Sequence, residues 1–214
     1  MSLKTAFICD SAIAIHKAII AHEADIEGLD RAIGDGDHYL NVKRGAETIA
    51  GMADVLKLYP PEEALNKISM KLLSSIGGAA GPLFASFFME MASYIKQSKS
   101  NNLSMLEIAA AFAAGVQGIV HRGKASLGEK TMLDVLIPVS TSFTLSAAAG
   151  KSVAQICADV KAAADEGLEN TRNLVATKGR AAGLGERAIG HLDAGAKSCQ
   201  VMVHAVCDLL LKAN

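Results

Sequence analysis

The residues best suited to chemistry in this 214-residue chain stand close together near its beginning. The stretch AIGDGDHYLN holds Asp35, Asp37, His38 and Asn41, and Asp30 stands just before it. Because unpaired carboxylates are costly to bury, this cluster is either a solvated Asp-Gly turn or a site for a cation. Three carboxylates suit Mg²⁺, which keeps several waters and takes further oxygens from phosphates.

A second segment, GGAAG at residues 77–81, is followed by Pro82 and an apolar helical pattern. Glycines let the backbone approach a ligand closely, and proline is typical of a first helical position. The exposed N–H groups of a helix N-terminus attract phosphate. The alternative is that these small residues serve close packing between helices.

A third segment, RGKASLGEKT, is close to the phosphate-binding P-loop pattern. Glu129 separates Gly128 from Lys130, and no strand is expected before the segment, so we reject a P-loop here. The basic residues Arg122, Lys124 and Lys130 are then either counter-charges to phosphate or ordinary solvated side chains.

A fourth segment, residues 178–194, combines four glycines with Arg180 and Arg187, which is typical of a lid or clamp. The arginines could bind phosphate in a fork. Three carboxylates facing a di- or triphosphate would repel it unless divalent cations lie between them. The carboxylates, glycine-rich turns and basic residues of the four segments are typical of a phosphoryl-transfer site, because that reaction depends on positioning and charge stabilisation.

Helices are expected to position these segments, because apolar residues recur at helical spacing and alanine, leucine and isoleucine carry the hydrophobic fraction. Ser104 with Glu107, and Ser152 with Gln155, match capping boxes. We expect Pro138 to kink its helix. The pattern predicts one all-α domain, residues 1–214, of eight antiparallel helices at 4–29, 41–58, 61–76, 82–97, 104–121, 131–146, 152–177 and 195–212.

This alternation has a consequence for the four polar segments. In an up-and-down bundle, the connections after the first, third, fifth and seventh helices lie at one end. These connections are residues 30–40, 77–81, 122–130 and 178–194. The pattern therefore predicts that the four loops meet.

Composition excludes several classes of protein. The net charge is −1 and the pI is near 6.6, which predicts neither a nucleic-acid partner nor binding to an anionic membrane. Cys9, Cys157, Cys199 and Cys207 form no CxxC pair and are interpreted as buried thiols of a reducing compartment. No signal peptide or membrane span is recognised, so we expect a soluble cytoplasmic protein.

The segments LDRAIGDGDH, LLSSIGGAAGPLFASFF, RGKASLGEKTMLDVLIPV and KGRAAGLGERAIGHLDAGA together resemble the L subunit of dihydroxyacetone kinases, the nucleotide-binding component DhaL. The resemblance covers nearly the whole chain, with its four blocks in order. It implies an eight-helix closed barrel with Mg-nucleotide at one end. It also implies that Asp30, Asp35 and Asp37 bind two Mg²⁺ ions.

The resemblance implies roles for further residues around ADP or ATP. His38 and Asn41 would sit beside the metals. The remaining expected contacts are Gly78, Ala79 and Ala80 near the phosphates and nucleoside, Gly123 and Met132 near adenine and ribose, and Arg180, Asp193, Ala194 and Gly195 closing over the nucleotide. Arg180 and the three aspartates would be the catalytic groups.

The resemblance also implies partners. A separate K subunit would hold dihydroxyacetone covalently, an M subunit of the phosphotransferase system would rephosphorylate bound ADP, and a homodimer of this chain is expected. Alternative hypotheses are an ATP-dependent kinase subunit for dihydroxyacetone or a related ketose or tetrulose, and a nucleotide-loaded regulatory module without turnover. The chain departs from the family pattern at Tyr39, where glycine is usual, at Ala80, where serine is frequent, and at Ala194, where proline is frequent.

Overall fold

The computed structural model describes residues 4–98 and 102–213, and within these ranges all regular structure is helical. The predicted all-α class is therefore confirmed. The α-helices are α1 (Thr5–Ala21), α2 (Glu23–Ile33), α3 (His38–Gly51), α4 (Ala53–Leu56), α5 (Pro61–Ser75), α6 (Ala80–Ser98), α7 (Met105–Gly123), α8 (Leu133–Ala148), α9 (Val153–Asn170) and α10 (Ala194–Ala213). Two 3₁₀ segments, η1 (Thr171–Asn173) and η2 (Arg180–Ala188), lie between α9 and α10.

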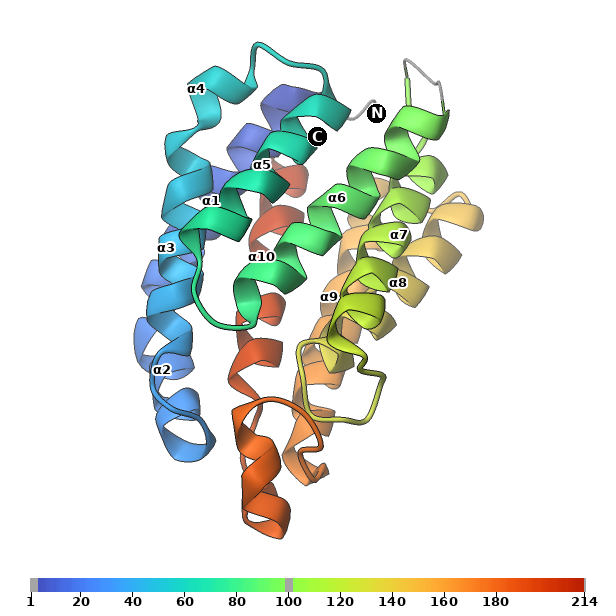
Figure 1. Ribbon diagram of the computed structural model, residues 1–214. Helices are drawn as coiled ribbons and strands as arrows, with labels where there is room; N and C mark the ends of the chain where they lie inside the picture. Colours follow the sequence, from blue (N-terminus) through green and yellow to red (C-terminus); the bar gives the residue numbers. More distant parts are fainter. Residues whose placement is uncertain (1–3, 99–101, 214) are drawn as a thin grey trace.

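The long helices pack in a closed cycle. Helix α1 contacts α3, α3 contacts α5, and the contacts continue through α6, α7, α8 and α9 to α10, which packs back against α1. Figure 1 shows these helices side by side, with both termini at one end and η2 at the other. None of the helices in the described residues is both long enough and apolar enough to cross a bilayer.

The first two predicted helices are each divided in two. The segment expected at 4–29 is interrupted at His22, whose ring Nδ1 lies 2.9 Å from the Ala18 carbonyl oxygen at the end of α1. The segment expected at 41–58 begins earlier, at His38, and is interrupted at Met52, directly after Gly51. Glycine is a poor helix former, which explains a break there.

The predicted helix boundaries at 61–76, 104–121, 131–146 and 195–212 hold to within about two residues. Both capping boxes are present, since Ser104 and Ser152 accept from the backbone N–H groups of Glu107 and Gln155. Helix α8 continues through Pro138. The four cysteines are buried free thiols, as expected.

The predicted helix 152–177 is wrong beyond Asn170. Helix α9 ends there and continues only as the short η1. The carbonyls of Thr171 and Leu174 accept from the ammonium of Lys130 rather than from helical N–H groups. The predicted loop 178–194 is also partly wrong, because η2 occupies Arg180–Ala188, with a kink at Gly185.

The core lies inside the ring and is apolar. Phe87 makes edge-on ring contacts with Phe88 and Phe112, at centroid distances of 5.3 Å in both cases. Small residues let the helices approach, as at Gly118, where an added Cβ would lie 2.8 Å from the Ser86 carbonyl oxygen. The packed ring thus fixes the loop end on which the polar segments lie.

Candidate functional site

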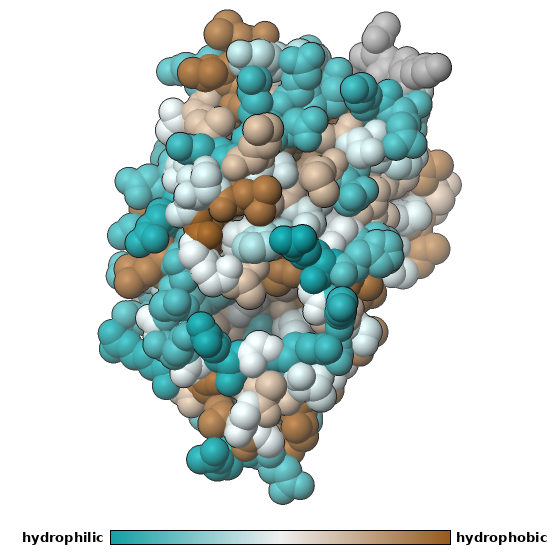
Figure 2. Space-filling model, viewed as in Figure 1, coloured by the Kyte–Doolittle hydropathy of each residue, from teal (hydrophilic) through white to brown (hydrophobic). Residues whose placement is uncertain are grey.

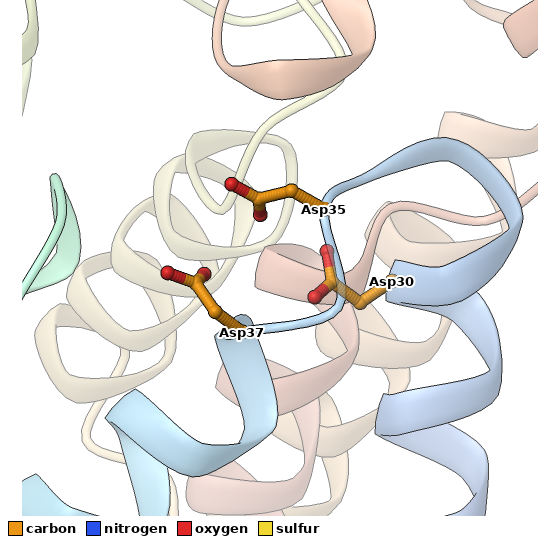
Figure 3. Close-up of side chains that lie close together, drawn as sticks. All are labelled: Asp30, Asp35 and Asp37. Atoms are coloured by element: carbon orange, nitrogen blue, oxygen red, sulfur yellow. The ribbon is translucent and has the colours of Figure 1, made fainter.

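The three aspartates of the first polar segment come together at the loop end of the ring. One carboxylate oxygen from each of Asp30, Asp35 and Asp37 lies within 4.8 Å of the other two. Figure 3 shows Asp30 on a helix and the other two on the turn that follows it. Asp30 was expected in a loop; it lies instead in the last turn of α2 and is buried. Closely spaced carboxylate oxygens are hard ligands that fit Mg²⁺.

Two glycines give this acidic loop its shape. At Gly34 an added Cβ would lie 1.9 Å from Oδ1 of Asp30, so only glycine leaves room for that carboxylate. Gly36 has a φ of 79°, a left-handed conformation that glycine adopts without strain. The other oxygen of Asp30 accepts from the backbone N–H of His38 at 2.9 Å, which joins α2 to the start of α3.

The four polar loops border one pocket of about 590 Å³. The predicted meeting of these loops is therefore found in the structure. Figure 2 shows the surface hollowed in the lower half of the view, with hydrophilic side chains around the hollow. The residues that the family resemblance implies all line the pocket: Asp30, Asp35, Asp37, His38, Asn41, Gly78, Ala79, Ala80, Gly123, Met132, Arg180, Asp193, Ala194 and Gly195.

The second loop leads directly into α6. This helix starts at Ala80, two residues earlier than expected, so Ala80 and Gly81 belong to its first turn. A Cβ at Gly81 would lie 2.5 Å from the Ile76 carbonyl oxygen, so the turn between α5 and α6 requires a residue without a side chain. Gly78 has a φ of 66°, and a Cβ added there would lie 3.8 Å from Nδ2 of Asn41.

The third loop is organised by a buried carboxylate that the sequence analysis did not identify. Asp134, at the start of α8, accepts from the backbone N–H groups of Gly128 at 2.6 Å and Thr131 at 2.7 Å. The structure contradicts a phosphate counter-charge at Lys130, because that side chain is buried with its ammonium bound to carbonyls. Lys124 is exposed and does not line the pocket, whereas Arg122 does.

The fourth loop reaches back to the acidic loop. Nε of Arg180 lies 2.7 Å from Oδ2 of Asp35. Further on, Oδ2 of Asp193 accepts from the backbone N–H of Ala196 at 2.7 Å, at the start of α10. Burial raises the pKa of the Asp193 carboxyl to about 7, and the nearby carboxylate of Asp134 acts in the same direction.

Sequence reasoning missed Ser198, which is fully buried and lines the pocket. Its hydroxyl lies 3.0 Å from Nε2 of His38 and donates to the Gly195 carbonyl at 2.9 Å. Ser198 therefore links the first residue of α3 to the first turn of α10. Desolvation lowers the pKa of His38, and the carboxylates of Asp30 and Asp37 oppose that shift. The only signal in the sequence was that Ser198 lies one helical turn after Gly195.

Tyr39 points away from the pocket. Its side chain is 1% exposed and packs in an apolar cluster with Ile19, Ile26 and Val42, between α1, α2 and α3. It does not line the pocket. The departure from the family pattern at this position therefore changes the packing behind the acidic loop and leaves the pocket wall unaltered.

With this geometry in view, comparisons with known proteins decide the family. The model of the DAK2 domain family matches residues 32–208. The chain belongs to this family. It is 39% identical over 178 residues to the PEP-dependent dihydroxyacetone kinase, ADP-binding subunit DhaL, of Escherichia coli K12, covering 83% of this chain and 84% of that one. It is 38% identical over 199 residues to the corresponding subunit of kinase 2 of Listeria innocua, covering 92% and 91%.

Longer proteins carry a similar segment. The human triokinase/FMN cyclase is 29% identical over 196 residues, which are 90% of this chain but 33% of that protein. The crystal structure of the C. freundii dihydroxyacetone kinase in complex with AMP-PNP and Mg²⁺ matches with a TM-score of 0.74 at 23% identity, over 98% of this chain and 35% of that one. This structural likeness supports the fold of the DAK2 family member described here.

Proposed function

We propose that this chain is the ADP-binding subunit of a dihydroxyacetone kinase, a phosphotransferase with an alcohol group as acceptor. The observation that carries the proposal is the convergence of Asp30, Asp35 and Asp37 within 4.8 Å at the wall of a pocket built by all four loops. Relatives of 39% and 38% identity over most of the chain are named as that subunit.

In this proposal the three aspartates hold two Mg²⁺ ions. Bound Mg²⁺ would supply charge neutralisation between the carboxylates and the nucleotide phosphates. The spacing of the oxygens and the burial of Asp30 support the carboxylates as ligands, since Mg²⁺ is bound by carboxylate oxygens. Titration with Mn²⁺ in the presence of ADP, followed by electron paramagnetic resonance, should give two ions per chain.

The remaining pocket residues would bind and orient the nucleotide. Backbone at Gly78, Ala79 and Ala80, at the start of α6, supplies N–H groups to phosphate oxygens. His38 and Asn41 flank the metals, and Gly123 and Met132 line the adenine and ribose region. Arg180 and the segment 193–195 close over the nucleotide, and the arginine stabilises charge on the moving phosphoryl group.

The acceptor would come from a partner. We propose a K subunit that carries dihydroxyacetone, because the relatives of 39% and 38% identity are named as one subunit, the ADP-binding one, of such a kinase. An M subunit of the phosphotransferase system, a homodimer and a cytoplasmic location belong to the same proposal. The names of the bacterial relatives, which are PEP-dependent or PTS-dependent, support ADP as a bound cofactor over exchangeable ATP.

The first test is to denature the purified chain and identify any released nucleotide by chromatography. We expect ADP near one mole per mole of chain. An empty site that then binds Mg-ATP would instead support the ATP-dependent alternative for dihydroxyacetone or a related ketose. Phosphorylated product should form only with the K subunit present. If no product forms although the nucleotide-loaded chain binds the K subunit, the chain is better explained as a regulatory module.

The metal site is tested by Asp35→Asn and Asp37→Asn. Each variant should lose Mg-dependent ADP binding in calorimetry while keeping its helical circular dichroism, because the change removes charge without removing volume. Asp25→Asn, at an exposed position in the first turn of α2, is the matched control. Wild-type affinity in both site variants would exclude these carboxylates as metal ligands.

A further inference from the structure

Lys130 is buried, and each of the three N–H donors of its ammonium group has a carbonyl acceptor. The residue is 1% exposed, and Nζ donates to the carbonyl oxygens of Thr171 at 2.6 Å, Leu174 at 3.2 Å and His191 at 2.6 Å. An ammonium has three N–H donors, so the three carbonyls replace its hydration. Burial lowers the pKa of Lys130, and the nearby carboxylate of Asp193 favours the charged form.

The backbone of Lys130 is in a conformation that lysine does not prefer. Its φ is 59°, in the left-handed region, which is unfavourable for a residue with a Cβ. Lys124, at the end of α7, has a φ of 47° and an exposed side chain. Glycine would adopt the left-handed backbone at 124 and 130 more readily than lysine. The lysine at 130 is therefore explained by the hydrogen bonds of its side chain.

The three carbonyls lie on both sides of the lid, which we define as residues 175–190. Thr171 and Leu174 precede it, and His191 follows it. The same turn makes a further contact with the first part of the lid, because the Thr177 hydroxyl donates to Oε1 of Glu129 at 2.9 Å. Within the lid, Arg180 reaches Asp35 on the acidic loop.

We propose that Lys130 is a positioning residue that ties both ends of the lid to the turn before α8 and so aims Arg180 into the pocket. The buried ammonium acts as a single pin, because it binds the carbonyls of Thr171 and Leu174 before the lid and that of His191, which follows them by 20 and 17 residues. The part of this inference that concerns nucleotide release rests on the proposed function, whereas the part that concerns the lid does not.

The test compares Lys130→Gly, Lys130→Met and the matched control Lys124→Gly. Both glycine variants relieve a left-handed backbone, but only the first removes the pin. Hydrogen exchange followed by mass spectrometry, without ligand, should show faster exchange confined to residues 174–192 in both Lys130 variants. Limited trypsin digestion should cut first after Lys178, Arg180 or Arg187 in those variants. Lys124→Gly should match the wild type in exchange and in cleavage within the lid.

Release of a fluorescent ADP analogue with Mg²⁺ gives the second readout. Both Lys130 variants should release the analogue about tenfold faster. This corresponds to a loss of about 1.4 kcal/mol in the free energy that holds the lid closed. If Lys130→Gly does not fold, Lys130→Met decides, since methionine nearly keeps the volume of the side chain but has no N–H donor.

Two results would overturn the inference: exchange in the lid of both Lys130 variants equal to the wild type, or faster exchange spread evenly over all helices. A wild type that binds no Mg-ADP, with the lid loosened in the Lys130 variants, would instead refute the proposed function and leave the pin intact.

Discussion

Nε of Arg180 lies 2.7 Å from Oδ2 of Asp35, which joins the lid to the acidic loop across the mouth of the pocket. The two side chains are 69% and 39% exposed, so the pair itself adds little to stability. Its importance is positional. The arginine charge already sits beside one of the carboxylates that we assign to the metal, where phosphate charge would also gather.

Arg180→Ala should therefore lower the rate of phosphoryl transfer more than the affinity for nucleotide. Loss of one charge-stabilising group costs about 10²–10³-fold in rate. We expect the dissociation constant of Mg-ADP to rise by less than about tenfold, since the aspartates remain. Single-turnover transfer to the K subunit and calorimetry measure the two quantities separately.

The control for this variant is Arg187→Ala, because Arg187 lies on the same 3₁₀ segment but does not line the pocket. It should keep the wild-type rate to within about twofold. Equal loss of affinity and rate in Arg180→Ala would show that the arginine serves ground-state binding alone.

Gly34→Ala should disable the acidic loop. The added methyl would lie 1.9 Å from Oδ1 and 2.8 Å from the carbonyl oxygen of Asp30, so the carboxylate must move away from its two neighbours. The backbone of Gly34, with φ near −119°, is open to alanine, so the effect comes from the side chain alone. Mg-dependent ADP binding should be lost in calorimetry.

Gly28→Ala, in the same helix, is the matched control for this prediction. A Cβ at Gly28 meets nothing within 4 Å, so alanine should stabilise α2 by about 0.5–1 kcal/mol and leave ADP binding unchanged. Urea denaturation measures the gain. Full ADP affinity in Gly34→Ala would show that the site does not depend on the space that Gly34 leaves for the Asp30 carboxylate.

The sequence predicted the gathering of the four loops because it needed only helical periodicity and the alternation of direction. It placed Asp30 in a loop because it ended the helix at residue 29, whereas α2 continues for one more turn to Ile33. The end of α9 could not be predicted either. It depends on the ammonium of Lys130, which is 41 residues away from Thr171 along the chain.

Contacts of this kind explain the other omissions as well. Ser198 meets His38 across 160 residues of sequence, and Asp134 was hidden in an apolar helical pattern. Burial of a polar side chain depends on the packing of several helices, whereas amphipathic spacing reports only one face of one helix. The aspartates and Arg180 were found from residue types and the other expected pocket residues through family resemblance, whereas Ser198 and Asp134 were found only in the structure.

Asp193 should make stability depend on pH. Its pKa is raised from 3.8 to about 7, so the folded state binds a proton more tightly than the unfolded state. The contribution of this group to the free energy of unfolding is therefore fully present below pH 4 and is lost as pH rises through 7. Asp193→Asn keeps an acceptor for the Ala196 N–H and removes that loss.

Urea denaturation at pH 5 and pH 8 tests this dependence. The stability of Asp193→Asn relative to the wild type should be greater at pH 8 than at pH 5. Asp25→Asn, at an exposed position, should show the same difference from the wild type at both values. A pH-independent difference for Asp193→Asn would mean that the carboxyl titrates alike in the folded and unfolded chains.

The whole chain should unfold as one domain although its core has two main apolar clusters. One cluster gathers residues of α7 to α10, and the other gathers residues of α1 and α4 to α7. Phe84 packs against both, which couples them. Because the native chain has no tryptophan, Phe143→Trp and Tyr94→Trp place one probe beside each cluster.

In each tryptophan variant, fluorescence and far-ultraviolet circular dichroism should give the same urea midpoint, as expected for cooperative two-state unfolding. The comparison is made within one variant, so any change in stability that the substitution causes affects both signals equally. Two domains would instead give a fluorescence midpoint displaced from the dichroism midpoint, in opposite directions for the two variants. That outcome would separate α7 to α10 from the first half of the ring and contradict a single domain.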